Sequence, residues 1–155
     1  MPRKVLIVED DEHKIEDIIS FWQEHVPSDI LKLARSVREA VVAVYQEEFG
    51  VVVLDMALPT FNQSIRTSGG TSQPQGGLEV IRTLSAVKRN AQVIVFTQYD
   101  GIEIEGEFFP IKDSPSLLSS RYSINVVDAI LYEYQSPDWR RQLLLKLSSN
   151  WDLEG

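Results

Sequence analysis

Cysteine is absent from the sequence, and positive charge and long hydrophobic runs are scarce. The lack of cysteine excludes disulfide bonds, thiolate metal sites and thiol catalysis. Lys and Arg total 15 against 23 Asp and Glu, so the formal net charge of -8 disfavours direct binding to nucleic acid or anionic lipid. No apolar run approaches membrane-spanning length, and the first residues do not resemble a signal peptide. We therefore expect a cytoplasmic protein whose partners are metal ions or proteins.

The length of 155 residues fits one compact domain. Hydrophobic residues make up 43% of the chain and charged residues 25%, the balance of a globular protein with its own core. We expect a single domain over residues 1–155. Polar and glycine-rich composition predicts one long loop over about 56–76, and a second long loop is expected over about 98–115.

Apolar runs and amphipathic segments alternate along the chain. Continuous apolar runs rich in β-branched residues predict buried parallel strands at 5–8, 51–54 and 93–96. Weaker strands are expected at 30–34, nearer an edge, and at 126–134. Helical spacing of apolar residues predicts helices near 15–26, 36–50, 76–89 and 136–151. The order predicts an α/β, flavodoxin-like, doubly wound five-stranded parallel sheet, with helices on both faces.

Acidic and hydroxyl side chains follow the apolar runs directly. Glu9 and Asp10 follow the first run, Asp55 follows the third strand, and Thr97 ends the fourth. Ligands of open parallel sheets bind beyond the carboxyl ends of the strands, so these side chains are expected to meet at one edge. Clustered carboxylates repel one another unless a cation joins them, and Mg²⁺ prefers such oxygen ligands. The pattern indicates a Mg²⁺ site.

The segments "VLIVEDDE", "VVVLDMALP" and "VIVFTQ" resemble the receiver domain of bacterial response regulators, in matching order and over nearly the whole chain. The resemblance implies two-component signalling with strand order 2-1-3-4-5. It implies that Asp55 is the phosphoacceptor and that Thr97 hydrogen-bonds the phosphoryl group. It also implies a Mg²⁺ site formed by Glu9, Asp10, Asp55 and the backbone carbonyl of Ala57.

One feature of that family is missing. Receivers carry a lysine at the end of the fifth strand, but no lysine occurs here between Lys112 and Lys146. Glu133, Tyr134 or Gln135 could occupy the position. A charge-assisted hydrogen bond contributes about 1.5–3 kcal/mol, so its loss should weaken the phosphorylated state at least tenfold unless another cation enters. Arg66 and Lys112, in the two long loops, are candidates, although surface cations usually have no such role.

Two functions remain open at this stage. The first is a stand-alone receiver, a phosphoprotein of a phosphorelay, that takes a phosphoryl group from a histidine kinase or phosphotransfer protein and signals to an unknown downstream protein. The second is a phosphorylation-independent interaction or dimerisation module, which the missing lysine favours. A hydrolase with an aspartyl-phosphate intermediate is disfavoured, because such enzymes carry a second acid where this chain has Ala57. We therefore expect a signalling module rather than an enzyme.

Overall fold

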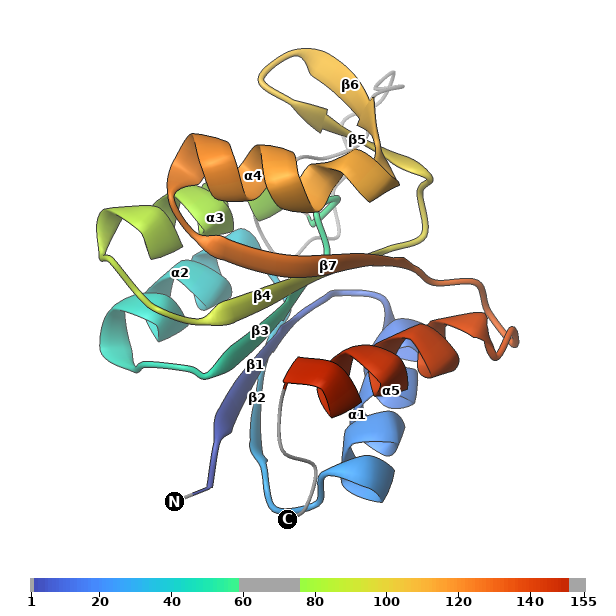
Figure 1. The fold of residues 1–155 in the computed structure, drawn as a ribbon. Helices are drawn as coiled ribbons and strands as arrows, with labels where there is room; N and C mark the ends of the chain where they lie inside the picture. Colours follow the sequence, from blue (N-terminus) through green and yellow to red (C-terminus); the bar gives the residue numbers. More distant parts are fainter. Residues whose placement is uncertain (1, 59–75, 151–155) are drawn as a thin grey trace.

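The computed structural model describes residues 2–58 and 76–150 (Figure 1). Five parallel strands form the main sheet in the order β2-β1-β3-β4-β7. Their bounds are Lys4–Val8 (β1), Ile30–Ala34 (β2), Val51–Leu54 (β3), Gln92–Thr97 (β4) and Asn125–Leu131 (β7). Since β7 is the fifth parallel strand along the chain, the predicted order 2-1-3-4-5 is confirmed, and β2 lies at an edge as expected.

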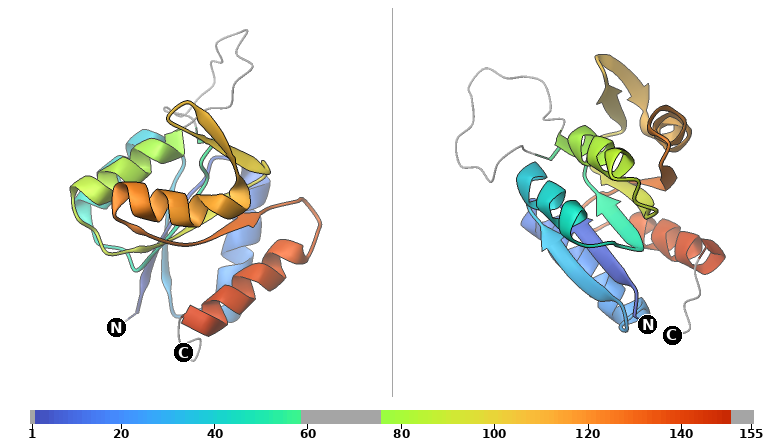
Figure 2. Two further views of the ribbon diagram at one scale, coloured as in Figure 1. Left: turned by 45° about the horizontal axis from the view of Figure 1, so that its top comes forward. Right: turned by 90° about the vertical axis from the view of Figure 1, so that its left-hand side faces the viewer.

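Helices cover both faces of this sheet (Figure 2). The helices are α1 (Glu12–His25), α2 (Val37–Gln46), α3 (Gly76–Ala86), α4 (Ser114–Tyr122) and α5 (Asp138–Asn150). Buried side chains of α1 and α5 share one hydrophobic cluster, whereas those of α2, α3 and α4 share the other. The three central strands are almost fully buried because both of their faces are covered, which explains their uninterrupted apolar sequence.

Two polar side chains fix the helix starts nearest the strand ends. Asp11 is the N-cap of α1, where its carboxylate accepts a hydrogen bond from the amide of His13 at 2.9 Å. Ser36 is the N-cap of α2, and its hydroxyl accepts from the amide of Glu39 at 3.2 Å. These bonds satisfy amides that have no partner within the helix. The two caps thereby fix the conformation of the short turns that join β1 to α1 and β2 to α2.

The segment expected to be a loop over about 98–115 contains regular structure. Strands β5 (Gly101–Ile104) and β6 (Glu107–Pro110) form an antiparallel sheet, followed by the short helix η1 (Ile111–Asp113) and the start of α4. Glu105 and Gly106 connect the strands with φ angles of 50° and 89°. A two-residue turn with both φ angles positive matches the twist of a hairpin, and glycine adopts it without strain. Of the other expected loop, 59–75 lie outside the described residues.

Strand β7 is shorter than the predicted 126–134 and carries a β-bulge. Its pairing with β4 shifts between Val93 and Ile94, whose partners are Val126 and Asp128. Val127 is therefore the extra residue. After this shift Ala129 packs on the α2–α3–α4 side, whereas Ile130 and Tyr132 lie on the α1–α5 side. The strand ends at Leu131, opposite Thr97.

Candidate functional site

Adjacent strands bring the acidic residues together at the carboxyl edge of the sheet. Val8 pairs with Leu54, so the residues that follow them leave the sheet side by side. The amide of Asp55 donates to the carbonyl oxygen of Val8 at 3.0 Å, which ties the end of β3 to the end of β1. The predicted convergence of Glu9, Asp10 and Asp55 follows from this register.

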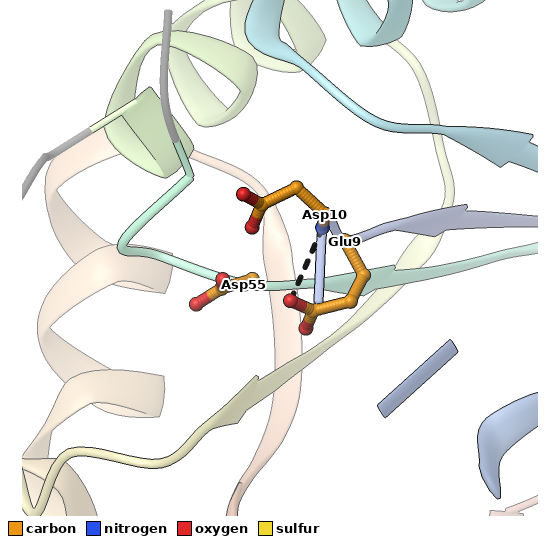
Figure 3. A group of neighbouring side chains, drawn as sticks. All are labelled: Glu9, Asp10 and Asp55. Carbon is orange, nitrogen blue, oxygen red and sulfur yellow. Dashed lines mark hydrogen bonds between the residues drawn. The ribbon is translucent and has the colours of Figure 1, made fainter. Parts of the chain in front are cut away.

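The three carboxylates form one cluster (Figure 3). Each of Glu9, Asp10 and Asp55 offers one oxygen, and these oxygens all lie within 4.8 Å of one another. Glu9 and Asp55 are only 1% and 5% exposed, whereas Asp10 is open to solvent. The other oxygen of Glu9, Oε2, accepts from the amides of Asp10 and Asp11 at 3.2 Å each. We call these three carboxylates, two of them buried and one open to solvent, the acidic pocket.

Burial and mutual repulsion make negative charge costly in this pocket. Burial is the largest cause that raises the pKa of Glu9, to about 8, and the Asp55 carboxylate raises it further. Burial and then Asp55 also raise the pKa of Asp10. A cation that neutralised these groups would relieve both effects, so the pocket favours positively charged ligands.

Sequence reasoning missed a residue of this site, Lys14. Its side chain is 1% exposed, and its Nζ lies 2.9 Å from Glu9 Oε1 and 3.8 Å from Asp55 Oδ2. Burial alone would lower the pKa of Lys14, but Asp55 and Glu9 raise it above its ordinary value, so the amine keeps its charge. Among the described residues, Lys14 is the cation paired with Asp55.

Tyr132 directly follows β7, in the stretch between Lys112 and Lys146 that contains no lysine. The amide of Tyr132 donates to the carbonyl oxygen of Thr97 at 2.7 Å, so Tyr132 is the residue that lies beside Thr97. Glu133, Tyr134 and Gln135, the residues that the longer predicted strand placed here, lie beyond the strand and are exposed. The Tyr132 hydroxyl donates to Asp17 Oδ2 at 2.6 Å, on the α1 side.

Four predicted residues remain, and three of them lie in the described part of the chain. Thr97 ends β4 and is buried, and its hydroxyl accepts from the amide of Tyr99 at 3.1 Å. The amide of Ala57 donates to Asp55 Oδ1 at 3.0 Å. Of the suggested replacements for the missing lysine, Arg66 lies outside the described residues and Lys112 is exposed on η1.

The start of α3 packs directly against the turn that follows Asp55. The amides of Gly76 and Gly77 donate to the carbonyls of Leu58 and Met56 at 3.0 and 3.1 Å. A Cβ atom on Gly77 would lie 2.5 Å from Met56 Cα and 2.8 Å from the Asp55 carbonyl oxygen. Only glycine permits this approach, which holds the Asp55 turn against a helix end.

Gly77→Ala is therefore expected to lower the free energy of unfolding by about 2 kcal/mol or more, since backbone atoms would have to move to admit the methyl group. Urea denaturation followed by circular dichroism measures this change. Glu79→Ala, at an exposed position of the same helix, is the control and should stay within about 0.5 kcal/mol of the parent protein. Equal stability of the two variants would contradict the close packing.

The donor set fits a hard divalent cation. Glu9 Oε1 is buried and accepts no well-aligned hydrogen bond, although it lies in ion-pair range of Lys14. Three carboxylates and one ammonium group leave two formal negative charges, which a divalent cation would balance. The ligands on offer are all oxygens, the chemistry that Mg²⁺ selects.

No protein-family model matches the chain. The Detocs response regulatory protein DtcB of Vibrio alginolyticus is 29% identical over 148 residues, which make up 94% of this chain and 99% of that protein. DtcB of Enterobacter cloacae is 22% identical over 147 residues, 94% of this chain and 98% of that protein.

Solved structures show the same fold. The CheY-like response regulator receiver domain protein of Methanospirillum hungatei matches with a TM-score of 0.64 and 17% identity, covering 96% of this chain and 93% of that one. The response regulator TrrA of Thermotoga maritima, solved in complex with Mg²⁺ and BeF, matches with a TM-score of 0.56 and 18% identity, over 94% of this chain and 99% of that one.

Fold and sequence similarity together define the chain as a response-regulator receiver domain, a signalling module. Within this class, the chain is similar over nearly its whole length to the DtcB proteins. Among the described residues, no helix is both long and apolar enough to cross a membrane. The predicted flavodoxin-like fold and two-component class are confirmed.

Proposed function

We propose that Asp55 accepts a phosphoryl group from a histidine kinase or phosphotransfer protein in the cytoplasm, and that the protein then signals through a changed interaction surface. The observation that carries this proposal is the placement of Asp55, which is buried at a strand end and is one of three carboxylates whose offered oxygens lie within 4.8 Å of one another. Phosphoryl transfer needs a positioned nucleophile and strong charge neutralisation, and this pocket favours both.

Each site residue has a defined task in this proposal. Glu9, Asp10, Asp55 and the carbonyl of Ala57 would hold Mg²⁺, which neutralises charge on the phosphoryl oxygens. A carboxylate oxygen of Asp55 forms the new bond to phosphorus, while the bond from phosphorus to the donor breaks and its electron pair leaves with the donor group. The buried Thr97 hydroxyl accepts from Tyr99 and keeps its own proton to donate to a phosphoryl oxygen.

The test is the mass of the intact protein after incubation with Mg²⁺ and acetyl phosphate. A single Mg²⁺-dependent phosphoryl adduct is expected in the wild type and in Asp113→Asn, an exposed aspartate whose side chain makes no capping bond. Asp55→Ala should carry none. An equal adduct in Asp55→Ala, or no adduct in the wild type, would refute the proposal.

A phosphorylation-independent interaction or dimerisation module is the second candidate. It is favoured by the sequence around the end of the fifth parallel strand, where the neutral Tyr132 follows β7 and no lysine occurs between Lys112 and Lys146. Burial and the hydrogen bond to Asp17 raise the pKa of Tyr132, so this hydroxyl stays protonated. Beryllofluoride, which mimics the phosphoryl group, should bind the wild type if the first proposal holds and should not bind if the second does.

A further inference from the structure

A phosphoryl group on Asp55 would bring roughly -1.5 to -2 charges into a pocket that is already acidic. Burying such a group requires a paired cation with hydrogen-bond donors, because an uncompensated charge away from water is costly. The Lys14 ammonium group is the one cation that the described residues place beside Asp55.

The geometry holds Lys14 within reach of the acceptor oxygen. Its Nζ is 3.8 Å from Asp55 Oδ2, just beyond hydrogen-bond range, and 2.9 Å from Glu9 Oε1. The rings of Phe96 and Tyr132 also lie near it, each with its centroid 5.9 Å from Nζ. Aromatic faces attract ammonium groups, so these rings help to hold the amine beside the acidic pocket.

Tyr132, the residue that follows β7, places an aromatic ring rather than a charged group beside Lys14. The Tyr132 hydroxyl is engaged with Asp17, so the residue presents its ring rather than a polar group to Lys14. The positive charge comes instead from Lys14 of α1. Asp11 caps this helix, and with the helix starting there Lys14 lies on its buried face.

We propose, on the basis of phosphorylation at Asp55, that Lys14 of α1 supplies the positive charge that binds the phosphoryl group in place of a lysine on the last strand. When the phosphorus–oxygen bond to Asp55 forms, the Nζ turns from Glu9 and donates a hydrogen bond to a phosphoryl oxygen. Lys14 keeps its proton throughout and makes no covalent bond.

The test compares two ligands in one variant, Lys14→Met, which keeps the apolar stem of the side chain and removes its charge. Binding of Mg²⁺ alone should be unchanged or tighter, because a repelling charge has gone. Binding of beryllofluoride at saturating Mg²⁺, followed by ¹⁹F NMR, should weaken at least tenfold. A merely structural role for Lys14 would weaken both, since a distorted pocket holds neither ligand.

Lys112→Met is the matched control and should bind beryllofluoride as the wild type does, because Lys112 is exposed on η1. Beryllofluoride binding by Lys14→Met within twofold of the wild type would overturn the proposal. So would a tenfold loss in Lys112→Met with none in Lys14→Met.

A crystal structure of the wild type with Mg²⁺ and beryllofluoride gives an answer that needs no variant, and it decides the matter if Lys14→Met does not fold. The Nζ is expected at hydrogen-bond distance from a fluorine atom, and an Nζ that stays on Glu9 alone would refute the inference. Failure of the proposed function looks different, because the wild type itself would then take up neither beryllofluoride nor a phosphoryl adduct.

Discussion

Glu9→Gln is expected to raise the free energy of unfolding of the metal-free protein at pH 8 by on the order of 3 kcal/mol. The carboxyl of Glu9 has a pKa of about 8 in the folded protein, against an ordinary value of 4.5. Between these values the folded protein keeps a proton that the unfolded chain releases. The wild type should therefore lose stability as pH rises from about 5 to about 8, whereas Glu9→Gln should not.

Urea denaturation in the presence of a chelator, repeated across this pH range, measures the effect. Glu16→Gln is the control, since Glu16 is an exposed carboxylate on the same helix as Lys14, and this variant should follow the wild type. A parallel pH dependence in the wild type and Glu9→Gln would contradict the prediction.

If Glu9 is a Mg²⁺ ligand, adding Mg²⁺ should make the wild type more stable than Glu9→Gln, the reverse of their order without metal. A ligand that binds only the folded state adds stability according to its concentration and affinity, so Mg²⁺ should stabilise the wild type at pH 8 and leave Glu9→Gln nearly unaffected. Glu9 would then be a residue that destabilises the empty pocket for the sake of the cation it holds.

Trp139→Ala is expected to cost about 3–5 kcal/mol of unfolding free energy, the range for deleting a large buried aromatic side chain. Trp139 is 1% exposed on α5 and its ring contacts those of Phe21, Phe96 and Tyr132 at centroid distances of 6.0, 5.4 and 5.8 Å. These contacts join α5 to α1 and to the strand ends.

Chemical denaturation measures the loss, and Leu145→Ala is the control on the same helix, because Leu145 is 70% exposed and should change stability by less than about 0.5 kcal/mol. Similar losses in both variants would mean that α5 is held by something other than this aromatic cluster. The burial of Trp139 makes it a packing residue of this cluster.

The parallel strands could be predicted because burial on both faces leaves a strong signal. Runs such as Val51–Leu54 have no polar residue to place on either side, and Asp55 after them marks the edge at once. The helix α4 gave no such signal, since Leu118 is its one fully buried large side chain and serines occupy much of the rest. The strands of the hairpin β5–β6 have only four residues each, so their alternation covers too few residues to give a strong signal.

Lys14 shows why one residue of the site escaped prediction. Lysine is almost never fully buried unless paired, so the residue type alone gives no sign that Lys14 belongs to a buried site. Yet Lys14 lies four residues before Ile18, and Ile18 four before Trp22, which places it on the buried stripe of α1. A charged residue on an apolar stripe, next to two acids at a strand end, is the signal that could have revealed it.

The bulge in β7 has a consequence for the chemistry at the strand end. Side chains of a strand alternate, so each extra residue exchanges the two faces for everything that follows. With Val127 counted out of the pairing, Tyr132 turns toward α1 and Lys14. If Val127 paired with Ile94 instead, the parity of every later residue would reverse, and the Tyr132 ring would point to the other layer. One unpaired residue, far from the acidic pocket in sequence, thus decides which side chain meets the cation.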